Sequence, residues 1–458
     1  MGLHRQEGNN NDTTGGGKMT LEDIIEERNI LGACMQVVRN AGAPGVDGMC
    51  TDDLYHHLVH EWDSYKTMLL TGTYRPQAVR RVEIPKPQGG VRELGIPTVM
   101  DRTIQQAIAQ QLDKLYDATF SEQSFGFRRG RSCHQALDKA TEHLNSGLGY
   151  IVEIDLEKFF DRVNHDRLMH VLSQRVSDKR VLRLIRSYLQ AGVMENGVIT
   201  RNEEGTPQGG NLSPILSNIV LDELDKELEQ RGHRFVRYAD DISIFTGSER
   251  SAGRILESIS GWIEKKLKLK VNRGKSGIKR PKDGQLLGFG FWHAKGGEIR
   301  PRVSEKSYTK LKEKVKKVTG RSWSVSMDER LTKLRQVTVG WVNYFAKADA
   351  RQRLVRMDEW IQARLRMCIW KQWKRVRTRI TNLQKLGANA QKAYEWGNTR
   401  KGYWRTAHSP ILQTTLTNKR LKQKGYVPML ETYTLRRESL MNRRDTEPYV
   451  RWCGGTEG

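Results

Sequence analysis

Residues 150–154 alternate between the two sides of an extended chain, with Tyr150, Val152 and Ile154 on one face. This period of two predicts a half-buried β-strand. Asp155 follows at once and leaves the strand end on the opposite face. Two interpretations are open: its carboxylate reaches the tip of a neighbouring hairpin, or it caps the N-terminus of a helix that follows the strand.

A second extended region surrounds the tetrapeptide Tyr238-Ala239-Asp240-Asp241. Two short apolar runs, 235–236 and 242–245, flank it, so it is predicted to form the tip of a β-hairpin. Adjacent carboxylates at a turn repel each other, and folding alone gives no reason to place them there. They become useful when divalent cations bind between them and a third carboxylate, as in a two-metal nucleotidyl transferase.

A glycine-rich loop and a helix lie between these two regions. The glycines of 205–212 permit close backbone approach of a template or nucleotide, although an ordinary loop before a helix has the same appearance. Ser213-Pro214 is interpreted as N-cap and first helical turn. Apolar residues then recur every four positions from Leu216 to Leu228, and Gly232 ends the predicted helix.

The remaining pattern predicts helical pieces on both sides of a mixed central region. The expected elements are helices within 20–64 around a turn at 42–48, two strands within 80–98 joined by 87–90, a helix at 101–118, mixed α/β structure over 150–300 and helices from 303 onward.

Charge narrows the class of partner. The 458 residues, enough for two to four domains, include 78 Lys and Arg against 53 Asp and Glu, a net charge of +25. Such an excess repels itself unless a polyanion neutralises it, which favours nucleic acid over the rival partner, an anionic membrane. No apolar run approaches twenty residues and no signal peptide is seen, so we expect a soluble cytoplasmic protein without membrane contact.

The five cysteines are scattered, without the paired spacing of a zinc module or a disulfide framework. They are Cys34, Cys50, Cys133, Cys368 and Cys453. We interpret them as buried or incidental thiols.

The segment 364–380 carries seven cations and, between 364 and 379, no acid. The cations are Arg364, Arg366, Lys371, Lys374, Arg375, Arg377 and Arg379. Apolar residues recur at helical spacing, so one face can pack while the others stay basic. A solvated helix face is the simpler interpretation, but the interleaved Trp370 and Trp373 favour a nucleic-acid surface.

Three motifs in fixed order resemble the palm of a reverse transcriptase: 153–163 (EIDLEKFFDRV), 205–232 (GTPQGG to ELEQRG) and 237–241 (RYADD). The residues of these motifs resemble those of the group II intron-encoded reverse transcriptase/maturase family. The similarity runs from about residue 20 to about 440 and includes 42–48, 72–76, 80–102, 124–132, 269–276, 287–289 and 340–345. It is strongest to compact members that lack an endonuclease domain, because the cysteine pairs of that domain are not seen.

The resemblance implies a multidomain α+β fold, a right-hand polymerase with fingers, a palm built on an antiparallel sheet, and a helical thumb. We expect a flexible tail at 1–18, an N-terminal extension at 19–64, fingers at 65–149, palm at 150–300, helical thumb or maturase domain at 301–380 and a C-terminal basic DNA-binding segment at 381–445.

The resemblance further implies RNA-directed DNA synthesis from dNTPs with two Mg²⁺ ions, for which Mn²⁺ is a possible substitute. Asp155 and Asp240 would be the principal ligands, Asp241 would contribute less directly, and the backbone carbonyl of Leu156 would be a further ligand. One ion would activate the primer 3′-hydroxyl and the other would neutralise the triphosphate.

Other family positions map onto the substrate side of the site. Lys86 and Arg92 flank the tip of the predicted fingers hairpin and would bind the incoming triphosphate, or they are simply exposed charges. Gln208 would bond at the nascent base pair. Lys275 would protonate departing pyrophosphate or bind phosphate, and the sequence leaves both roles open.

Phe159 follows Asp155 by four residues, one turn if the segment is helical, so it would share the site with the carboxylates. In the family a bulky residue here crowds the ribose 2′-hydroxyl. The alternative is that Phe159 and Phe160 belong to the core.

The implied partners are an RNA template, a DNA or RNA primer, intron RNA and target DNA, with the protein a monomer or homodimer of the bacterial cytoplasm. Splicing and retrohoming would accompany polymerisation. Two alternatives stay open: a splicing cofactor in which catalysis is dispensable, and a domesticated or defence-associated reverse transcriptase.

Overall fold

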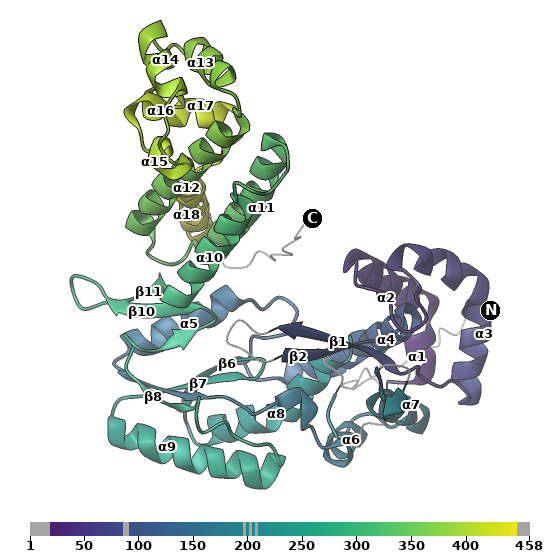
Figure 1. Ribbon diagram of the computed structural model, residues 1–458. Helices are drawn as coiled ribbons and strands as arrows, with labels where there is room; N and C mark the ends of the chain where they lie inside the picture. Colours follow the sequence, from purple (N-terminus) through teal and green to yellow (C-terminus); the bar gives the residue numbers. More distant parts are fainter. Residues whose placement is uncertain (1–18, 86–90, 196–197, 201–203, 207–208, 447–458) are drawn as a thin grey trace, which may run out of the picture. The chain divides into compact units, whose positions relative to one another are not determined.

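The computed structural model describes residues 19–85, 91–195, 198–200, 204–206 and 209–446. The chain forms two compact units, the first ending at Lys279 and the second beginning at Arg280 (Figure 1). This boundary precedes residue 300, where the sequence placed the end of the palm. None of the helices in the described ranges is both long enough and apolar enough to cross a bilayer.

The first unit contains two sheets and nine α-helices in its described part. Its helices are α1 (Leu21–Ile25), α2 (Glu27–Arg39), α3 (Leu54–Thr71), α4 (Val99–Tyr116), α5 (Cys133–Asn145), α6 (His165–Ser173), α7 (Lys179–Gln190), α8 (Ser213–Gln230) and α9 (Glu249–Trp262). Its strands are β1 (Val79–Pro85), β2 (Val91–Ile96), β3 (Tyr150–Ile154), β4 (Val193–Glu195), β5 (Val198–Thr200), β6 (Arg234–Tyr238), β7 (Asp241–Thr246) and β8 (Gly277–Lys279).

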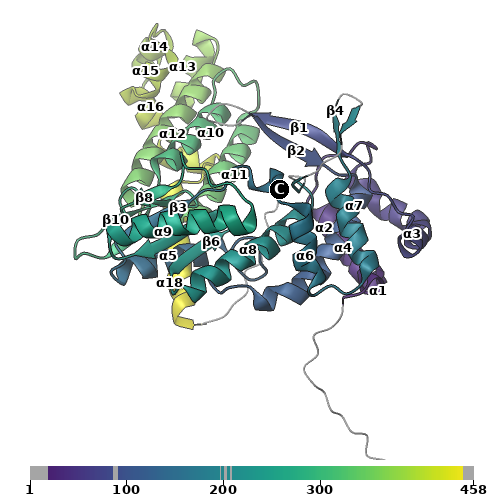
Figure 2. The same cartoon turned by 90° about the horizontal axis from the view of Figure 1, so that it is seen from below.

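The palm sheet has the strand order β6-β7-β3-β8 and is antiparallel throughout. The sheet contains the strand predicted at 150–154, which is β3. It also contains the hairpin predicted around 238–241, which is formed by β6 and β7. On one face, Val152, Ile154, Ile242 and Ile244 join a continuous apolar core with residues of α8 and α9. Figure 2 shows these two helices side by side in front of the sheet.

The opposite face of the palm sheet changes character along its length. At one end Ile151 lies opposite Phe245, whose ring contacts His143 of α5 with centroids 5.3 Å apart. The next pair toward the hairpin tip is Glu153 and Ser243. Since side chains alternate between faces, Asp155 and Asp241 continue this same row. The face is therefore covered by a helix at one end and acidic at the other.

The second sheet of this unit carries the fingers hairpin. Strands β1 and β2 pair antiparallel, from Arg80 opposite Ile96 to Pro85 opposite Val91, as the sequence predicted for 80–98. β4 joins β1 in parallel and β5 completes the order β2-β1-β4-β5. The N-terminal helices α1 and α2 pack in the same apolar core as α4.

One open alternative and two local predictions in this unit are wrong. Asp155 does not cap a helix and Phe159 does not lie one helical turn beyond it, because Leu156 forms a bridge with Val271 and Lys158 takes a left-handed φ of 48° before a short 3₁₀ turn. Ser213 is the first residue of α8, not its N-cap, which is Leu212. The predicted end at Gly232 is close: α8 ends at Gln230 and Gly232 has a φ of 71°.

The second unit is mainly helical after a small sheet. It contains β9 (Gln285–Leu286), β10 (Phe289–His293), β11 (Ile299–Val303), α10 (Glu305–Val318), α11 (Met327–Phe345), α12 (Arg351–Gln372), α13 (Val376–Lys385), α14 (Ala390–Gly397), α15 (Tyr403–Ala407), α16 (Pro410–Thr415), α17 (Asn418–Gln423) and α18 (Met429–Thr446). The prediction that helices follow from residue 303 onward is confirmed by α10 to α18.

The turn at Leu287-Gly288 joins β9 to β10, and both residues have positive φ, 52° and 82°. The hydroxyl of Tyr344 donates to the Leu287 carbonyl at 2.9 Å, and that of Ser307 donates to the Gly288 carbonyl at 3.0 Å. Phe289 packs within this cluster against Phe345, with ring centroids 4.8 Å apart and the rings tilted by 54°. The turn is thus fixed by α10 and α11.

The basic segment 364–380 is not one helix. It breaks at Trp373, where α12 ends, and α13 starts at Val376. Two of its cations are used inside the unit: Arg364 donates to the carbonyl of Thr319 at 3.1 Å, and buried Arg366 donates to that of Leu416 at 2.9 Å. The interpretation of seven cations as one outward surface is therefore wrong for these two.

Candidate active site

Three aspartates occupy neighbouring backbone positions at the tip of the palm hairpin. Tyr238 pairs with Asp241, which leaves Ala239 and Asp240 as a two-residue turn, and Ala239 has a left-handed φ of 58°. In the neighbouring pair, Ile154 lies opposite Ile242. Asp155 therefore comes next to Asp241 on the same face, which confirms the predicted meeting of the strand end with the hairpin tip.

Charge repulsion is visible in the electrostatics of this group. Desolvation, and then the negative charges of Asp240 and Asp155, raise the pKa of Asp241 to about 6. Glu153 adds to the rise and Lys275 opposes it. Because the Asp241 side chain is also reached by solvent, water screens part of this repulsion. A site that raises the pKa of a carboxyl group in this way favours a bound cation.

The backbone around Asp155 is held by a segment that follows α9. The Asp155 N–H donates to the hydroxyl of Ser276 at 3.0 Å, and its carbonyl accepts from the Asn272 N–H at 2.8 Å. The Glu157 N–H donates to the Lys270 carbonyl at 2.8 Å. These bonds surround the bridge at Leu156 and turn the Leu156 carbonyl away from this segment, as an additional metal ligand would require.

The structure brings Lys275 to the carboxylates. Its ammonium lies 3.7 Å from a carboxylate oxygen of Asp155, and its side chain is 68% exposed. An ion pair this long and this open is weak, so the lysine can exchange partners at little cost.

A buried ion pair supports the hairpin turn from beneath, and the sequence analysis missed it. Arg237 and Asp225 of α8 are both fully buried and joined by two hydrogen bonds of 2.7 and 2.6 Å. Arg237 also donates to the Ala239 carbonyl and to the Asn218 side chain, each at 3.0 Å. The only feature of the sequence that could have indicated this pair is an arginine within a strand that is otherwise largely apolar.

The segment 123–126 closes over the same turn. Its backbone pairs with Arg237 through two hydrogen bonds of 2.9 Å, one from the Phe125 N–H and one to the Gln123 carbonyl. Gly126 lies so close that a Cβ there would be 2.3 Å from the Ala239 nitrogen. The Gly126 carbonyl accepts from the Asn218 amide at 2.9 Å. This contact explains why glycine is required in the motif at 124–132.

The glycine-rich loop is tied to the region after Asp155. The N–H groups of Gly205 and Thr206 donate to the carbonyls of Val163 and Phe160 at 2.9 and 2.6 Å. Gly205 has a φ of 87°, and a Cβ there would meet the backbone of residues 160–161 at 2.8 Å. The loop therefore sits directly against the 3₁₀ turn that carries Phe159.

Of the residues expected to contact the nucleotide, the structure describes only some. Phe159 is 3% exposed, and its ring packs edge-on against Phe160, with centroids 5.2 Å apart, so at least this phenylalanine is a core residue as the alternative proposed. Lys86 and Gln208 lie outside the described residues, as does the side chain of Arg92 in β2. Their assignments stay predictions.

The donor chemistry suits a hard divalent cation, since carboxylate and backbone carbonyl oxygens are the ligands that Mg²⁺ prefers. Within the described part of the chain, no three His, Cys, Asp or Glu side chains already stand as a metal-binding group. Asp155 and the hairpin carboxylates would have to turn toward a common point. The donor set therefore fits the ion by its chemistry.

Comparison with known families identifies the class of the domain that carries these residues. Residues 84–291 match the model for reverse transcriptase (RNA-dependent DNA polymerase), and residues 308–387 match the group II intron, maturase-specific domain. The site lies on the palm of a right-hand polymerase, and the domain that carries it is an RNA-directed DNA polymerase. Reverse transcriptase domains use divalent metal ions and bind nucleic acids such as RNA.

Three relatives place the chain further. Protein YkfC of Escherichia coli (strain K12) is 33% identical over 287 residues, which span 54% of this chain and 75% of that protein. The group II intron-encoded protein LtrA of Lactococcus lactis subsp. cremoris is 42% identical over 170 residues, 37% of this chain and 28% of LtrA. The putative COX1/OXI3 intron 2 protein of Saccharomyces cerevisiae is 31% identical over 278 residues, 48% of this chain and 32% of that protein.

The chain belongs to the family of group II intron reverse transcriptases and maturases. Its matches span less than a third of the two intron-encoded relatives, so the activities of those whole proteins are not carried over.

Proposed function

We propose that Asp155, Asp240 and Asp241 form the catalytic centre for copying RNA into DNA, with two Mg²⁺ ions held between them and the Leu156 carbonyl. The observation that supports this is the register of β3 against β7, which continues to bring Asp155 opposite Asp241 beside the two-residue turn. When bound, the ions supply an activated primer hydroxyl and neutralise the charge of the triphosphate.

The residues of the chain orient the reaction. Asp155 is anchored at its N–H and carbonyl, so its side chain starts from a fixed point. The turn that carries Asp240 is held by Arg237 on one side and by Gly126 on the other. Supporting contacts of this kind hold the carboxylates in place, so that the reacting groups stay aligned.

Lys275 and Phe159 serve the nucleotide in this proposal. Lys275, exposed beside Asp155, gives its proton to the departing pyrophosphate and stays as a phosphate contact. Phe159, fixed by packing, limits the space beside the ribose 2′ carbon. Lys86 and Arg92 bind the triphosphate, and Gln208 contacts the nascent base pair.

A second role in RNA splicing is favoured by the maturase-specific domain at 308–387. In this role the second unit binds intron RNA, and the same chain supports splicing and retrohoming as well as copying. A nucleic-acid partner also accounts for the net charge of +25. Target DNA, a monomeric or homodimeric state and a cytoplasmic location belong to the same proposal.

Primer extension tests the catalytic centre. A DNA primer annealed to an RNA template is incubated with dNTPs and Mg²⁺, and the parent protein is compared with Asp240→Ala and with Asp52→Ala, which removes an exposed carboxylate elsewhere. We expect full-length DNA from the parent and the Asp52 variant, and a loss of about 10³-fold or more in the Asp240 variant. Equal synthesis by all three would refute the assignment.

Splicing of a precursor RNA separates the two roles. If Asp240→Ala abolishes extension but leaves splicing intact, the chain has both functions at different sites. No extension by the parent, with tight RNA binding retained, would instead favour the splicing cofactor in which catalysis is dispensable.

A further inference from the structure

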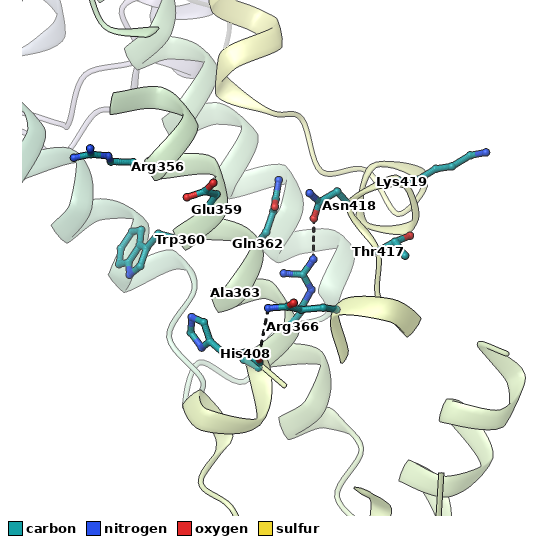
Figure 3. Close-up of a pocket in the computed structure, with 12 residues that line it drawn as sticks. Arg356, Glu359, Trp360, Gln362, Ala363, Arg366, His408, Thr417, Asn418 and Lys419 are labelled. Carbon is teal, nitrogen blue, oxygen red and sulfur yellow. Dashed lines mark hydrogen bonds between the residues drawn. The ribbon is translucent and has the colours of Figure 1, made fainter. Parts of the chain in front are cut away.

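The second unit holds an open pocket of about 810 Å³ between α12 and the segment from α15 to α17. Nine of its twelve lining residues are polar or charged. Figure 3 shows Arg366 near the middle of this group, close to Gln362, Asn418 and His408, with Trp360 at one side. Both walls lie within one compact unit, so the pocket is defined without reference to the palm.

Arg366 is a buried cation without an acid. It is 8% exposed, and its guanidinium donates to the Leu416 carbonyl at 2.9 Å and to the Asn418 side-chain oxygen at 2.8 Å. In the described part of the chain no carboxylate lies within salt-bridge distance of it. Burial alone lowers the pKa of Arg366, with no neighbouring charge to compensate. Buried charges are normally paired, so an anion beside this guanidinium would be bound favourably.

The other lining groups suit a nucleoside. His408 has its Nδ1 2.9 Å from the Trp404 carbonyl, which can only accept, so Nδ1 carries a proton and Nε2 is the ring atom that faces a ligand. Gln362 and Gln413 supply amides that can donate and accept. Trp360 provides an aromatic wall. Amides and rings together recognise the edges and faces of an unstacked base.

Cations at the rim can hold a strand on both sides of the pocket. Arg356 and Lys419 lie at opposite ends of the pocket and point outward in Figure 3. They can contact phosphates on either side of a nucleotide held inside. Glu359 is the acid on the wall and disfavours a phosphate beside it, which leaves Arg366 as the position for the phosphate.

We propose that this pocket binds one unstacked nucleotide of a single-stranded nucleic acid, with its phosphate at Arg366 and its base against Trp360 and His408. The inference rests on the proposed nucleic-acid binding function and adds to it a defined recognition site. The same nucleotide chemistry can come from an RNA or a DNA strand, and the experiment distinguishes them.

The test measures anisotropy of labelled single-stranded RNA and DNA oligonucleotides of one sequence, bound to the full chain. Arg356→Ala/Lys419→Ala is compared with Arg351→Ala/Lys424→Ala, which removes two exposed cations outside the pocket lining, one from α12 and one from the C-cap of α17. We expect the rim variant to bind about tenfold more weakly than its control. A loss of affinity for RNA alone supports a site for RNA, and a loss of affinity for both RNA and DNA supports a site for either strand. Equal affinities of the two double variants overturn it.

A second pair of measurements excludes a folding effect. His408→Ala changes an exposed ring and should lose affinity about fivefold while the thermal melting curve stays that of the parent. RNA carrying one 4-thiouridine should photocrosslink to the peptide that contains Trp360 or His408, and crosslinks only elsewhere contradict the proposal. Asp240→Ala should crosslink like the parent, so failure of the polymerase proposal and failure of this one are separate results.

Discussion

The guanidinium of Arg237 donates a 3.0 Å hydrogen bond to the carbonyl of Ala239, the residue whose left-handed backbone turns the acidic hairpin. An alanine at φ 58° costs about 1 kcal/mol relative to an ordinary backbone conformation. The hydrogen bond offsets that strain and fixes the residue immediately before Asp240. The position of the acidic turn therefore depends on a charge that is itself buried and paired.

Removing the partner of that charge should be costly. Asp225→Ala leaves Arg237 buried without a counter-ion, and we expect a loss of about 3–5 kcal/mol in the free energy of unfolding, measured with urea. Arg237→Lys keeps the charge but loses the paired geometry, so we expect kcat for primer extension to fall about tenfold or more, with a smaller change in KM for dNTP.

Arg231→Lys is the control, since its ion pair with Glu227 is partly exposed and should contribute less than about 0.5 kcal/mol. If Asp225→Ala unfolded at the same urea concentration as this control, the ion pair between Arg237 and Asp225 would not be needed for stability.

The close contact of Gly126 with the turn predicts a steric effect. In Gly126→Ala the new Cβ would meet the Ala239 nitrogen at 2.3 Å, which is backbone and cannot rotate away. We expect primer extension to fall by about 10²-fold because the carboxylates move. Gly247→Ala, with nothing within 4 Å of the added carbon, should extend primers like the parent. Activity of the Gly126 variant within twofold of that control would show that the turn tolerates displacement.

Phe159 should decide the choice between dNTP and rNTP. We expect Phe159→Leu to raise the relative kcat/KM for a ribonucleotide about tenfold, because the smaller side chain leaves room for a 2′-hydroxyl. Leucine is chosen because full truncation of a residue 3% exposed would cost about 3–5 kcal/mol of stability. Phe160→Leu is the control. Unchanged discrimination in the Phe159 variant would make that residue a core side chain only.

Asp178 predicts how stability responds to acid. Arg180 donates hydrogen bonds that lower the pKa of Asp178 from 3.8 to about 2, and the N–H of Leu21 contributes as well. A lowered pKa means that the stabilisation is complete above about pH 4 and is lost as the pH falls through 2. Since Arg180 is 41% exposed, we expect only about 1 kcal/mol from this contact.

The measurement is urea unfolding of Asp178→Asn and the parent between pH 2 and 7. The two should differ at pH 7 and converge below about pH 2. Asp166→Asn, which breaks an ion pair in which the aspartate is 79% exposed, serves as the control. A constant difference across the whole pH range would contradict the linkage.

The exposed part of the basic segment should set the salt dependence of RNA binding. Lys374, Arg375 and Arg377 are exposed after the break at Trp373, whereas Arg364 and Arg366 are held inside the unit. We expect the triple alanine variant to reduce the slope of log K against log salt by about 2. Arg250→Ala/Arg254→Ala/Lys265→Ala removes the same charge from exposed positions around α9 and should change the slope less. Equal slopes would show a general effect of net charge.

The sequence by itself determined the elements whose signals are local. The alternation of 150–154 and the apolar runs around residues 238–241 were enough to predict both strands of the site, because side chains on a half-buried sheet must alternate. The four-residue period after Ser213 similarly specified α8, though not its first residue, since helix ends depend on capping contacts. The order of motifs was enough to indicate the family.

Tertiary structure alone decided which distant residues support the site. Arg237 and Asp225 are ordinary charges in the sequence, and only the packing of α8 beneath β6 shows them to be a buried pair. Gly126 gains its meaning from the Ala239 backbone beside it, and Arg366 changes from a surface cation to an internal one through Leu416 and Asn418. Periodicity describes a residue relative to its own element, whereas burial and pairing depend on contacts between elements far apart in the chain.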